Sequence, residues 1–375
     1  MPIPRRRTML KWIEIDKKVI TENVRIIKAA LKKGVKFTAV VKANGYGHGA
    51  CETAEAAIIG GADSLAVLTA EEGLKLRKTF PDAKIKLLAP SLPEEAEAIA
   101  AGKLEPCPDS IDFLLAFEKA AKKHKGKSGF LPWTLPADTG MGRWGIAPEA
   151  FASFLKEATD TDKFQHIRLA GISTHLGYKP PQNMTDAEEK LKLFAKLAEQ
   201  ASSAAGRHIE ACAANSSVFC DFPDSQHDEV RIGNLMYGIY PTDIYRKRRQ
   251  GPPLPGLLRP WKFFAKIISV KQIRKGQKLG YNAEFTAPKD MRIAAIPAGY
   301  SDGLTMEPAE YQIRISSGFR YWGVINNKKA FFISKPGISH TLLDVSEIPE
   351  AIPGTAVSLH VRRTAANTLI PKIYV

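Results

Sequence analysis

The chain has 375 residues, of which 44% are hydrophobic and 25% charged, and this balance excludes a disordered or fibrous protein. No run approaches the roughly 20 apolar residues that a membrane span needs, and the charges of Lys11, Glu14 and Asp16 interrupt any core of a secretory signal. The net charge of +15 permits an acidic partner, and the length predicts about two domains.

The first 240 residues alternate short apolar runs with amphipathic segments. Runs rich in β-forming residues are found at residues 37–41, 64–68, 85–89, 129–135, 169–174, 208–213 and 229–232, with a weaker one at 104–107. Helical patterns lie between them, at residues 20–31, 69–78, 93–101, 111–123, 148–158 and 186–205. This alternation is typical of parallel strands buried on both faces. About eight such pairs predict a (β/α)8 barrel, with an open doubly wound sheet as the alternative.

The pattern changes after Arg249, where a segment rich in proline and glycine indicates a boundary. Beyond it, short alternating runs divided by turn residues predict a mostly antiparallel β domain. We therefore expect a barrel over residues 17–249 and a β domain over residues 250–375. We also expect a strand within residues 1–16 to join the sheet of the β domain.

Basic residues cluster at positions 5–7, 122–127 and 246–249. The first two clusters lack the interleaved aromatic residues or the reading helix of a nucleic-acid surface. The third follows Tyr240 and Tyr245 but precedes the proline-rich linker. We interpret all three as solvated surface and do not expect nucleic-acid binding.

The four cysteines are few for this length, and none forms a Cys-x-x-Cys pair. This usage argues against a disulfide framework and a zinc site, and it is typical of a cytoplasmic protein. We expect no metal centre, and we interpret the cysteines as small buried side chains.

Lys42 ends the first predicted barrel strand, and Gly45, Gly47 and Gly49 follow it. Ligands bind at the carboxyl ends of strands in α/β folds, and partial burial there lowers the pKa of a lysine and makes its amine nucleophilic. Glycines let the backbone approach a bound group closely. For a lysine in isolation, the alternative is a side chain that reaches out of the barrel mouth into water.

Residues 40–49, Val-Val-Lys-Ala-Asn-Gly-Tyr-Gly-His-Gly, resemble the pyridoxal-phosphate lysine motif of bacterial alanine racemases. Further motifs follow in the order of that family over roughly residues 11–360. The resemblance implies an enzyme in which Lys42 binds pyridoxal 5'-phosphate covalently and acts as one of two catalytic bases. It also implies that Tyr46 hydrogen-bonds the phosphate.

Other motifs imply the rest of the cofactor site. Residues 138–145 resemble the family segment whose arginine, here Arg143, binds the phenolic oxygen of the cofactor and the substrate carboxylate. His175 matches the histidine beneath the pyridine ring, and Arg231 matches the arginine that faces the pyridine nitrogen. The resemblance assigns further cofactor contacts to four residues after the last two barrel strands: Asn215, Ser216, Gly233 and Asn234. Taken alone, His175 could be an ordinary packed side chain, and an Asn-Ser pair is also common in turns and caps.

Two motifs lie in the predicted β domain. Residues 279–287 resemble the segment that carries the opposing catalytic tyrosine, here Tyr281, and residues 298–303 resemble the turn whose tyrosine, here Tyr300, lines the substrate entry. In the family these tyrosines reach the active site of the partner subunit, which implies a homodimer with composite sites. The implied reaction is racemisation of alanine, with Lys42 and Tyr281 acting on opposite faces of the substrate Cα. D-alanine for peptidoglycan would be the product.

The chain also departs from the family pattern. Pro136 stands where the family usually has a lysine that orients the arginine, and Cys212 replaces a histidine that supports Arg231. Ile338 and Ser339 occupy the positions of a Met-Asp pair near the substrate carboxylate, and the C-terminal segment is shorter. Two alternatives therefore stay open: a racemase of broader specificity, and a basic binding protein that has lost the activity.

Overall fold

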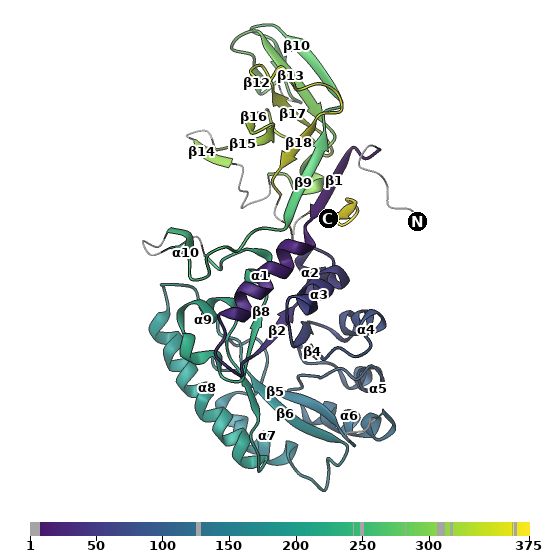
Figure 1. The fold of residues 1–375 in the computed structure, drawn as a ribbon, viewed down its shortest axis with the longest axis vertical. Helices are drawn as coiled ribbons and strands as arrows, with labels where there is room; N and C mark the ends of the chain where they lie inside the picture. The colour runs from purple at the N-terminus through teal and green to yellow at the C-terminus, as the bar shows by residue number, and fades with distance from the viewer. Residues whose placement is uncertain are drawn as a thin grey trace. The chain divides into compact units, whose positions relative to one another are not determined.

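The structure, a computed structural model, describes residues 8–124, 129–242, 244–247, 251–281, 283–305, 312–315, 318–361, 363 and 366–375. It divides the chain into two compact units (Figure 1). The barrel unit runs from Lys18 to Arg259, and the β unit combines the residues before Lys18 with residues 260–375. Parts of the three basic clusters, residues 5–7, 125–127 and 248–249, lie outside the described residues.

Parallel strands form the centre of the barrel unit. One sheet has the order β4-β3-β2-β8, and a second has the order β5-β6-β7. The strands are β2 (Lys36–Val40), β3 (Ser64–Val67), β4 (Ile85–Leu87), β5 (Leu131–Pro136), β6 (Ile167–Ser173), β7 (Glu210–Cys212) and β8 (Glu229–Ile232).

Backbone pairings at both edges close the two sheets into a barrel. Lys86 of β4 pairs in parallel with Glu105. The amide of Thr134 in β5 donates to the carbonyl of Pro106 at 2.9 Å, so the segment around these residues serves as a short strand between β4 and β5. At the other junction, Ala214 pairs in parallel with a residue of β8. The strands follow the chain order around a closed ring, which confirms the (β/α)8 barrel and excludes the open doubly wound sheet.

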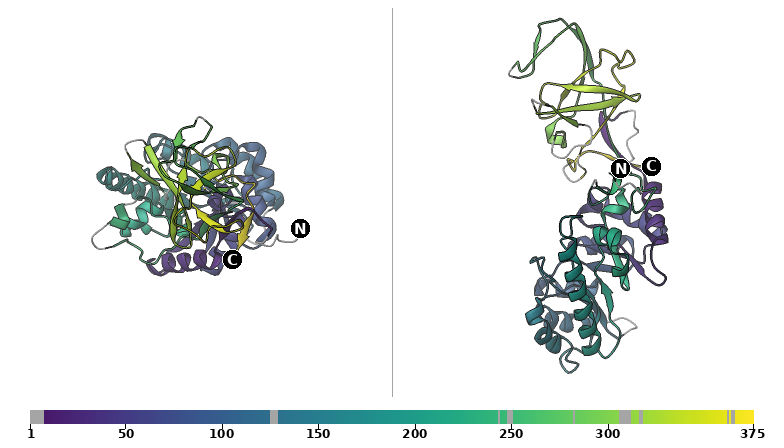
Figure 2. Two further views of the ribbon diagram at one scale, coloured as in Figure 1. Left: turned by 90° about the horizontal axis from the view of Figure 1, so that it is seen from above. Right: turned by 90° about the vertical axis from the view of Figure 1, so that its left-hand side faces the viewer.

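Helices cover the outside of these strands (Figures 1 and 2). They are α1 (Lys17–Ala29), α3 (Ala50–Ile59), α4 (Ala70–Thr79), α5 (Ala96–Ala101), α6 (Ile111–His124), α7 (Pro148–Ala158), α8 (Met184–Ala204) and α9 (Ser216–Asp221). A single further turn, α10 (Ile244–Lys247), lies on the segment beyond β8. Short 3-10 turns lie at Pro93–Glu95, Pro223–Gln226, Asn234–Tyr237 and, in the β unit, Tyr300–Asp302. Helix α1 buries Ile20, Val24 and Ile27, which recur on one face at helical spacing. Within the described ranges, no helix has the length and apolar character to cross a membrane.

The sequence pattern did not predict helix α3. This helix buries Ala54, Ala56 and Ala57, whereas Ile58 and Ile59 are 39% and 62% exposed. Because its buried face is made of small residues and larger apolar residues face outward, the segment lacks the one-sided pattern of an amphipathic helix.

The β unit is built on one large sheet, in the order β10-β13-β17-β16-β15-β18-β9-β1-β19, with β14 beside β15. Its strands are β1 (Lys11–Ile15), β9 (Trp261–Lys266), β10 (Ser269–Ile273), β13 (Met291–Ile296), β14 (Gln312–Ile315), β15 (Gly318–Ile325), β16 (Lys328–Ile333), β17 (Thr341–Asp344), β18 (Ala356–Leu359) and β19 (Lys372–Tyr374). Strands β11 (Lys278–Leu279) and β12 (Phe285–Thr286) form a separate hairpin. Among the described strands of this unit, all pairings are antiparallel except that of β1 with β19, which confirms the expected class.

The end of the proline-rich segment packs against the barrel unit. The side-chain amide of Asn23 donates to the carbonyls of Met236 at 2.8 Å and Leu258 at 2.7 Å, and its oxygen accepts from the amide of Leu258 at 2.9 Å. Gly238 has a φ of +65°, and a Cβ there would lie 2.1 Å from the carbonyl oxygen of Leu258. These contacts tie residue 258 to α1, and the change of unit follows at Pro260.

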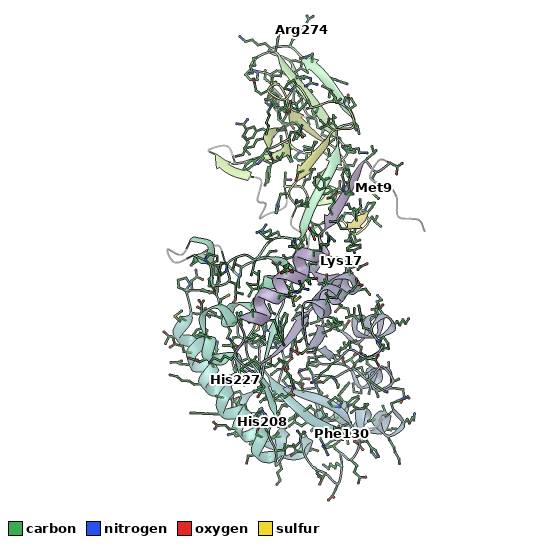
Figure 3. All side chains as sticks on the ribbon, viewed as in Figure 1. Met9, Lys17, Phe130, His208, His227 and Arg274 are labelled. Atoms are coloured by element: carbon green, nitrogen blue, oxygen red, sulfur yellow. The ribbon has the colours of Figure 1, made fainter. Side chains whose placement is uncertain are left out.

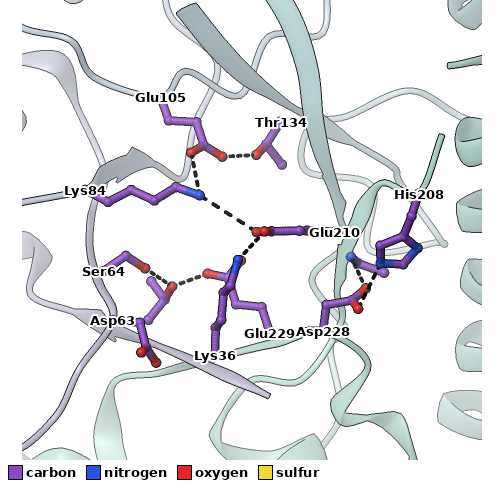
Figure 4. Close-up of polar contacts among 12 residues, drawn as sticks. Lys36, Asp63, Ser64, Lys84, Glu105, Thr134, His208, Glu210, Asp228 and Glu229 are labelled. Carbon is purple, nitrogen blue, oxygen red and sulfur yellow. Dashed lines mark hydrogen bonds and ion pairs between the residues drawn. The ribbon is translucent and has the colours of Figure 1, made fainter. Parts of the chain in front are cut away.

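Charged side chains gather at the amino-terminal end of the barrel, near the strand starts that Phe130 and His208 mark in Figure 3. We call this group the ionic floor. Salt bridges join lysines and glutamates in turn, and Figure 4 draws those of Lys36 and Lys84. The members are Lys36, Lys84, Lys86, Glu105, Glu210 and Glu229. The apolar runs of the sequence did not predict this layer, because a single charge in a run does not indicate which other charges the fold brings beside it.

Lys86 is the most buried cation of the ionic floor. Its amine pairs with Glu229 and lies 3.7 Å from Glu105, and the three side chains are at most 12% exposed. Burial alone would lower the pKa of Lys86, but Glu105 and Glu229 hold it above its ordinary value. Gly171 of β6 lets this strand pack closely against β7, because a Cβ there would lie 2.9 Å from the backbone carbonyl oxygen of Glu210.

We expect Lys86→Met to destabilise the protein strongly, because it leaves the carboxylates of Glu105 and Glu229 buried without this cation. Breaking a buried ion pair typically lowers the free energy of unfolding by about 3–5 kcal/mol, which urea unfolding can measure. Lys75→Met removes an exposed pair with Glu71 on α4 and is the matched control, with little expected change. Equal stability of the two variants would show that the ionic floor does not stabilise the barrel.

Candidate active site

A cavity of about 340 Å³ opens at the carboxyl ends of the barrel strands, within the size range of small-molecule sites. Residues that follow β2, β5, β6, β7 and β8 line it. Every site residue that the sequence predicts in the barrel unit lies on its wall: Lys42, Tyr46, Arg143, His175, Asn215, Ser216, Arg231, Gly233 and Asn234. The fold thus brings five separate segments of the chain to one place.

A left-handed turn begins at Lys42. Residues Lys42–Tyr46 are α2, in which Ala43, Asn44 and Tyr46 have φ values of +52°, +53° and +53°. A left-handed backbone costs a non-glycine residue about 1–2 kcal/mol, so contacts outside the turn must hold it. One such contact is the side-chain oxygen of Asn44, which accepts from the amide of Ala50 at 3.0 Å. Backbone strain of this kind is concentrated at functional sites.

The turn places Tyr46 against the backbone of Gly233. A Cβ at Gly233 would lie 2.5 Å from the hydroxyl oxygen of Tyr46, so a larger residue there would force the Tyr46 ring to move. The Tyr46 ring also packs on Tyr237, with ring centroids 5.2 Å apart. A phenol hydroxyl and the backbone at residues 233–234 therefore share one wall of the cavity.

The cavity is cationic on balance, since Lys42, Arg143 and Arg231 line it together with one carboxylate, that of Asp138. Burial, Arg143 and Arg231 lower the pKa of the Lys42 amine, and Glu72 acts in the opposite direction. Burial and then Arg231, Arg143 and Lys42 lower the pKa of His175 to about 3. An anionic ligand suits this site, and Lys42 is disposed to act as a neutral amine.

We expect His175 to stay neutral at mildly acidic pH. Because its folded pKa of about 3 lies below the ordinary value of about 6.5, the unfolded chain binds more protons between these values, and stability falls as the pH is lowered through this window. NMR of the cofactor-free protein labelled with ¹⁵N-histidine measures the protonation, and His175→Asn identifies the signal and should flatten the acid side of the stability profile. Titration of His175 near pH 6.5 would contradict this assignment.

Arg231 is fixed at the end of β8. Its guanidinium donates to the carbonyl of Thr174, and its amide donates to the carbonyl of Ala214 at 2.9 Å. Burial raises the pKa of the Cys212 thiol to about 12, although the positive charge of Arg231 acts to lower it. The residue that stands in place of the family's histidine is therefore a neutral thiol.

Arg143 lies on a loop that Asp138 organises. The Asp138 carboxylate accepts hydrogen bonds at 2.8 to 3.0 Å from three backbone amides, those of Gly140, Met141 and Gly142. The guanidinium carbon of Arg143 lies 3.6 Å from the centre of the Trp144 ring. Pro136, in the position of the family's orienting lysine, lines the same cavity. Where the family has an orienting lysine, this chain instead holds the Arg143 guanidinium by cation–π stacking on Trp144.

Asn215 makes the contacts of a helix N-cap. Its side-chain oxygen accepts from the amides of Ser217 at 2.9 Å and Val218 at 3.2 Å, and its amide donates to the carbonyl of Leu176 at 3.1 Å. Ser216, 7% exposed, follows at the start of α9. Asn215 therefore fixes the segment that presents Ser216 to the cavity.

The remaining predicted residues form a second group, within the β unit. Tyr281, Tyr300 and Ile338 are 79%, 51% and 60% exposed, and Ser339 is exposed as well. The amide of Tyr300 donates to the carbonyl of Gly337 at 3.0 Å, which sets the two turns side by side. The ring of His340 lies 5.8 Å from that of Tyr281, so His340 joins the group.

Sequence reasoning did not single out several residues that line the cavity: Cys107, Met141, Trp144 and Ser217. Trp144 could have been found from its place beside Arg143 in the quoted motif. None of the four cysteines forms a disulfide; Cys107 and Cys212 are buried as expected, while Cys51 and Cys220 are half-buried. In the part of the chain that the structure describes, no group of three or more His, Cys, Asp and Glu could hold a metal ion.

The chain is similar to known proteins along most of its length. The family model "Alanine racemase, N-terminal domain" matches residues 15–241, and "Alanine racemase, C-terminal domain" matches residues 261–370. The alanine racemase of Desulfosudis oleivorans is 29% identical over 356 residues, which cover 92% of this chain and 86% of that protein. Alanine racemase 1 of Bacillus subtilis is 33% identical over 296 residues, which cover 78% of this chain and 72% of that protein.

Solved structures share the fold. An alanine racemase from Bacillus anthracis with bound L-Ala-P gives a TM-score of 0.80 at 24% identity, covering 100% of this chain and 96% of that one. An alanine racemase from E. faecalis gives a TM-score of 0.82 at 23% identity and covers 100% of both chains. The two family models span the barrel unit and the β unit in turn, and the chain therefore belongs to the alanine racemase family of isomerases.

Proposed function

We propose that this protein interconverts L-alanine and D-alanine with pyridoxal 5'-phosphate as its cofactor. The observation that carries the proposal is Lys42, a half-buried amine of lowered pKa that ends a barrel strand and lines a cationic cavity. Relatives named alanine racemase, similar over most of the chain, support it.

The donors of the cavity fit this cofactor. Its phosphate and phenolic oxygen are anionic, and Lys42, Arg143 and Arg231 supply positive charge. The close approach of Tyr46 to Gly233 sets a hydroxyl donor beside bare backbone. We assign the phosphate to that wall of the cavity, with Ser216 and Asn234, and the ring to the wall that holds His175 and Arg231.

When bound, the cofactor supplies the electron sink that acidifies the Cα–H bond of an amino acid. Lys42 is proposed to bind the cofactor covalently and to move a proton on one face of the substrate. Arg231 keeps its own proton because a guanidinium has a pKa above about 12, so it can donate a hydrogen bond to the ring nitrogen without protonating it. Arg143 is the proposed cation for the substrate carboxylate.

The opposite face of the substrate requires a second acid–base group. We assign this role to Tyr281 from a second copy of the chain, with Tyr300, Ile338 and Ser339 at the substrate entry. The high exposure of Tyr281 within its own unit supports a role at an interface. The proposed enzyme is a homodimer with two composite sites.

Racemisation of purified protein samples, followed by chiral chromatography over a panel of L- and D-amino acids, tests the proposal. We expect alanine to react fastest. Comparable rates with long side chains would favour a racemase of broader specificity, which Ile338 and Ser339 in place of the Met-Asp pair motivate. A protein that neither retains added pyridoxal 5'-phosphate nor racemises any amino acid would overturn both the alanine racemase proposal and the broader-specificity alternative.

We further propose that the enzyme works in the cytoplasm and supplies D-alanine for peptidoglycan. Cysteines that form no disulfide and the family membership support this role. Rescue of a bacterial D-alanine auxotroph by the wild-type gene, but not by a Lys42→Ala variant, is the expected result. Failure of the wild type to rescue growth despite activity in vitro would contradict the physiological assignment.

A further inference from the structure

Glu72 makes an unusual set of contacts at the start of helix α4. Thr69 is the N-cap of this helix, and its hydroxyl accepts from the amide of Glu72 at 3.4 Å. In a capping box the glutamate at this position turns back to the amide of the N-cap residue. Here its two oxygens accept instead from the amide of Leu68 at 2.9 Å and from the amide of Ala43 at 2.6 Å.

These two amides lie at the exits of neighbouring barrel strands. Leu68 follows β3, and Ala43 follows Lys42 at the end of β2. One carboxylate therefore links helix α4 to two strand exits, one of which carries the proposed catalytic lysine. A hydrogen bond from an amide to an ionised carboxylate is stronger than one to a neutral acceptor, and the distance of 2.6 Å is short for its kind.

The amide of Ala43 needs an acceptor from outside the turn. Ala43 is the first left-handed residue after Lys42, with φ +52° and ψ +50°. The leading amides of a helical turn have no acceptor within the turn, so a side chain or water must bind them. Glu72 supplies that acceptor at the point where the backbone leaves the strand and enters the strained conformation.

Glu72 also sets the charge around Lys42. The groups that act on the Lys42 amine are Arg143 and Arg231, which lower its pKa, and Glu72, which raises it. The charge of Lys42 in turn acts on His175, which stays neutral above a pH of about 3. Among these described neighbours, Glu72 is the acidic one.

We propose that Glu72 is a positioning residue for Lys42: its carboxylate fixes the left-handed turn and so aims the lysine amine into the cavity. The proposal rests on the function proposed for Lys42. It differs from a plain helix cap in what it predicts, because a cap stabilises α4 without affecting the chemistry of a residue on another strand.

Glu72→Gln and Glu72→Ala separate charge from hydrogen bonding. Glutamine removes the charge and has one acceptor oxygen, so it can accept from the amide of Ala43 or from that of Leu68 but not from both. Alanine removes the charge and both acceptors. Glu71→Gln is the matched control, because Glu71 is the adjacent acid on the same helix, is exposed and pairs with Lys75.

The first readout uses cofactor-free protein and follows acetylation of Lys42 by acetic anhydride against pH, with peptide mass spectrometry. Since Glu72 raises the pKa of Lys42, its loss should move the labelling midpoint to lower pH in both Glu72 variants and not in Glu71→Gln. An unchanged midpoint in both Glu72 variants would overturn the proposal. This readout needs no cofactor, so it remains decisive even if the proposed racemase function fails.

The second readout is the dissociation constant of pyridoxal 5'-phosphate, measured by titrating cofactor-free protein and following fluorescence. Loss of a hydrogen bond to a charged group should weaken binding roughly tenfold or more in Glu72→Ala, with a smaller effect in Glu72→Gln. A lower Tm in both variants with wild-type affinity would identify a helix cap and reject the positioning role. In the racemase assay we expect kcat to fall while KM for alanine stays within about twofold, as for an interaction made only in the transition state.

Discussion

Replacing Lys42 with alanine is expected to reduce racemisation below detection and to abolish covalent retention of pyridoxal 5'-phosphate. Among the described residues that line the cavity, Lys42 is the one with a primary amine. Arg143 and Arg231 remain in the variant, so the cofactor should still bind without a covalent bond and with reduced affinity. Reduction with borohydride followed by peptide mass spectrometry shows whether the cofactor is attached and to which residue.

Lys42→Arg distinguishes the charge of this side chain from its basicity. Arginine keeps the positive charge, but its guanidinium does not become a neutral nucleophile at physiological pH. We therefore expect a folded protein that is as inactive as Lys42→Ala. Lys75→Ala, which removes an exposed lysine of α4, should retain full activity. Covalent cofactor in Lys42→Ala after reduction would show that another residue is the attachment site.

The barrel could be predicted because its strands are apolar runs separated by helical patterns. The weakest of these runs, at residues 104–107, was also the hardest to assign, and in the structure it contributes only a short bridge between β4 and β5. Its place in the ring depends on pairing with both neighbours, which a local pattern does not contain. Helix α3 escaped prediction for the opposite reason, since its buried residues are small and its larger apolar residues are exposed.

The sequence analysis assigned no role to the single charges of the barrel strands. Lys86 and Glu105 lie within apolar runs, and Glu229 begins one. Only the closed ring of strands brings them within reach of one another, where opposite charges make burial acceptable. The same reasoning applies to Glu72, because the contact of its carboxylate with the amide of Ala43 depends on tertiary structure, which a local pattern does not contain.

The candidate site illustrates two kinds of prediction. The position of Lys42 at a strand exit followed from physical reasoning, because the carboxyl ends of barrel strands meet at one face. The other cavity residues came from motif resemblance, and in the structure they line the same cavity as Lys42. Trp144 stands beside Arg143 in the motif, but its stacking on the guanidinium of Arg143 depends on the loop that Asp138 organises, so its role as a support became visible only in the structure.

Tyr281→Phe is expected to reduce racemisation roughly 10²–10⁴-fold, the usual contribution of a general acid–base group. The variant keeps the ring beside His340 and removes only the hydroxyl. Because Tyr281 is 79% exposed, stability should not change. Lys42 and covalent cofactor retention should be unaffected. Proton removal should still occur from one enantiomer, so exchange of the α-proton in deuterated water, measured by NMR, should persist for one enantiomer of alanine and be lost for the other.

Mixing Lys42→Ala with Tyr281→Phe tests whether the two residues act in one site across a subunit interface. Each variant alone is inactive, but a mixed dimer contains one site that combines an intact Lys42 with an intact Tyr281. Random exchange of subunits in a twofold-symmetric dimer makes half of the dimers mixed, so about a quarter of the wild-type activity should return. Native mass spectrometry verifies the exchange, and the double variant mixed with wild type is the control. If subunits exchange and no activity returns, Tyr281 does not complete the site of a second copy. If Tyr281 acted within its own subunit, each subunit of a mixed dimer would lack one of the two residues, and both sites would stay inactive.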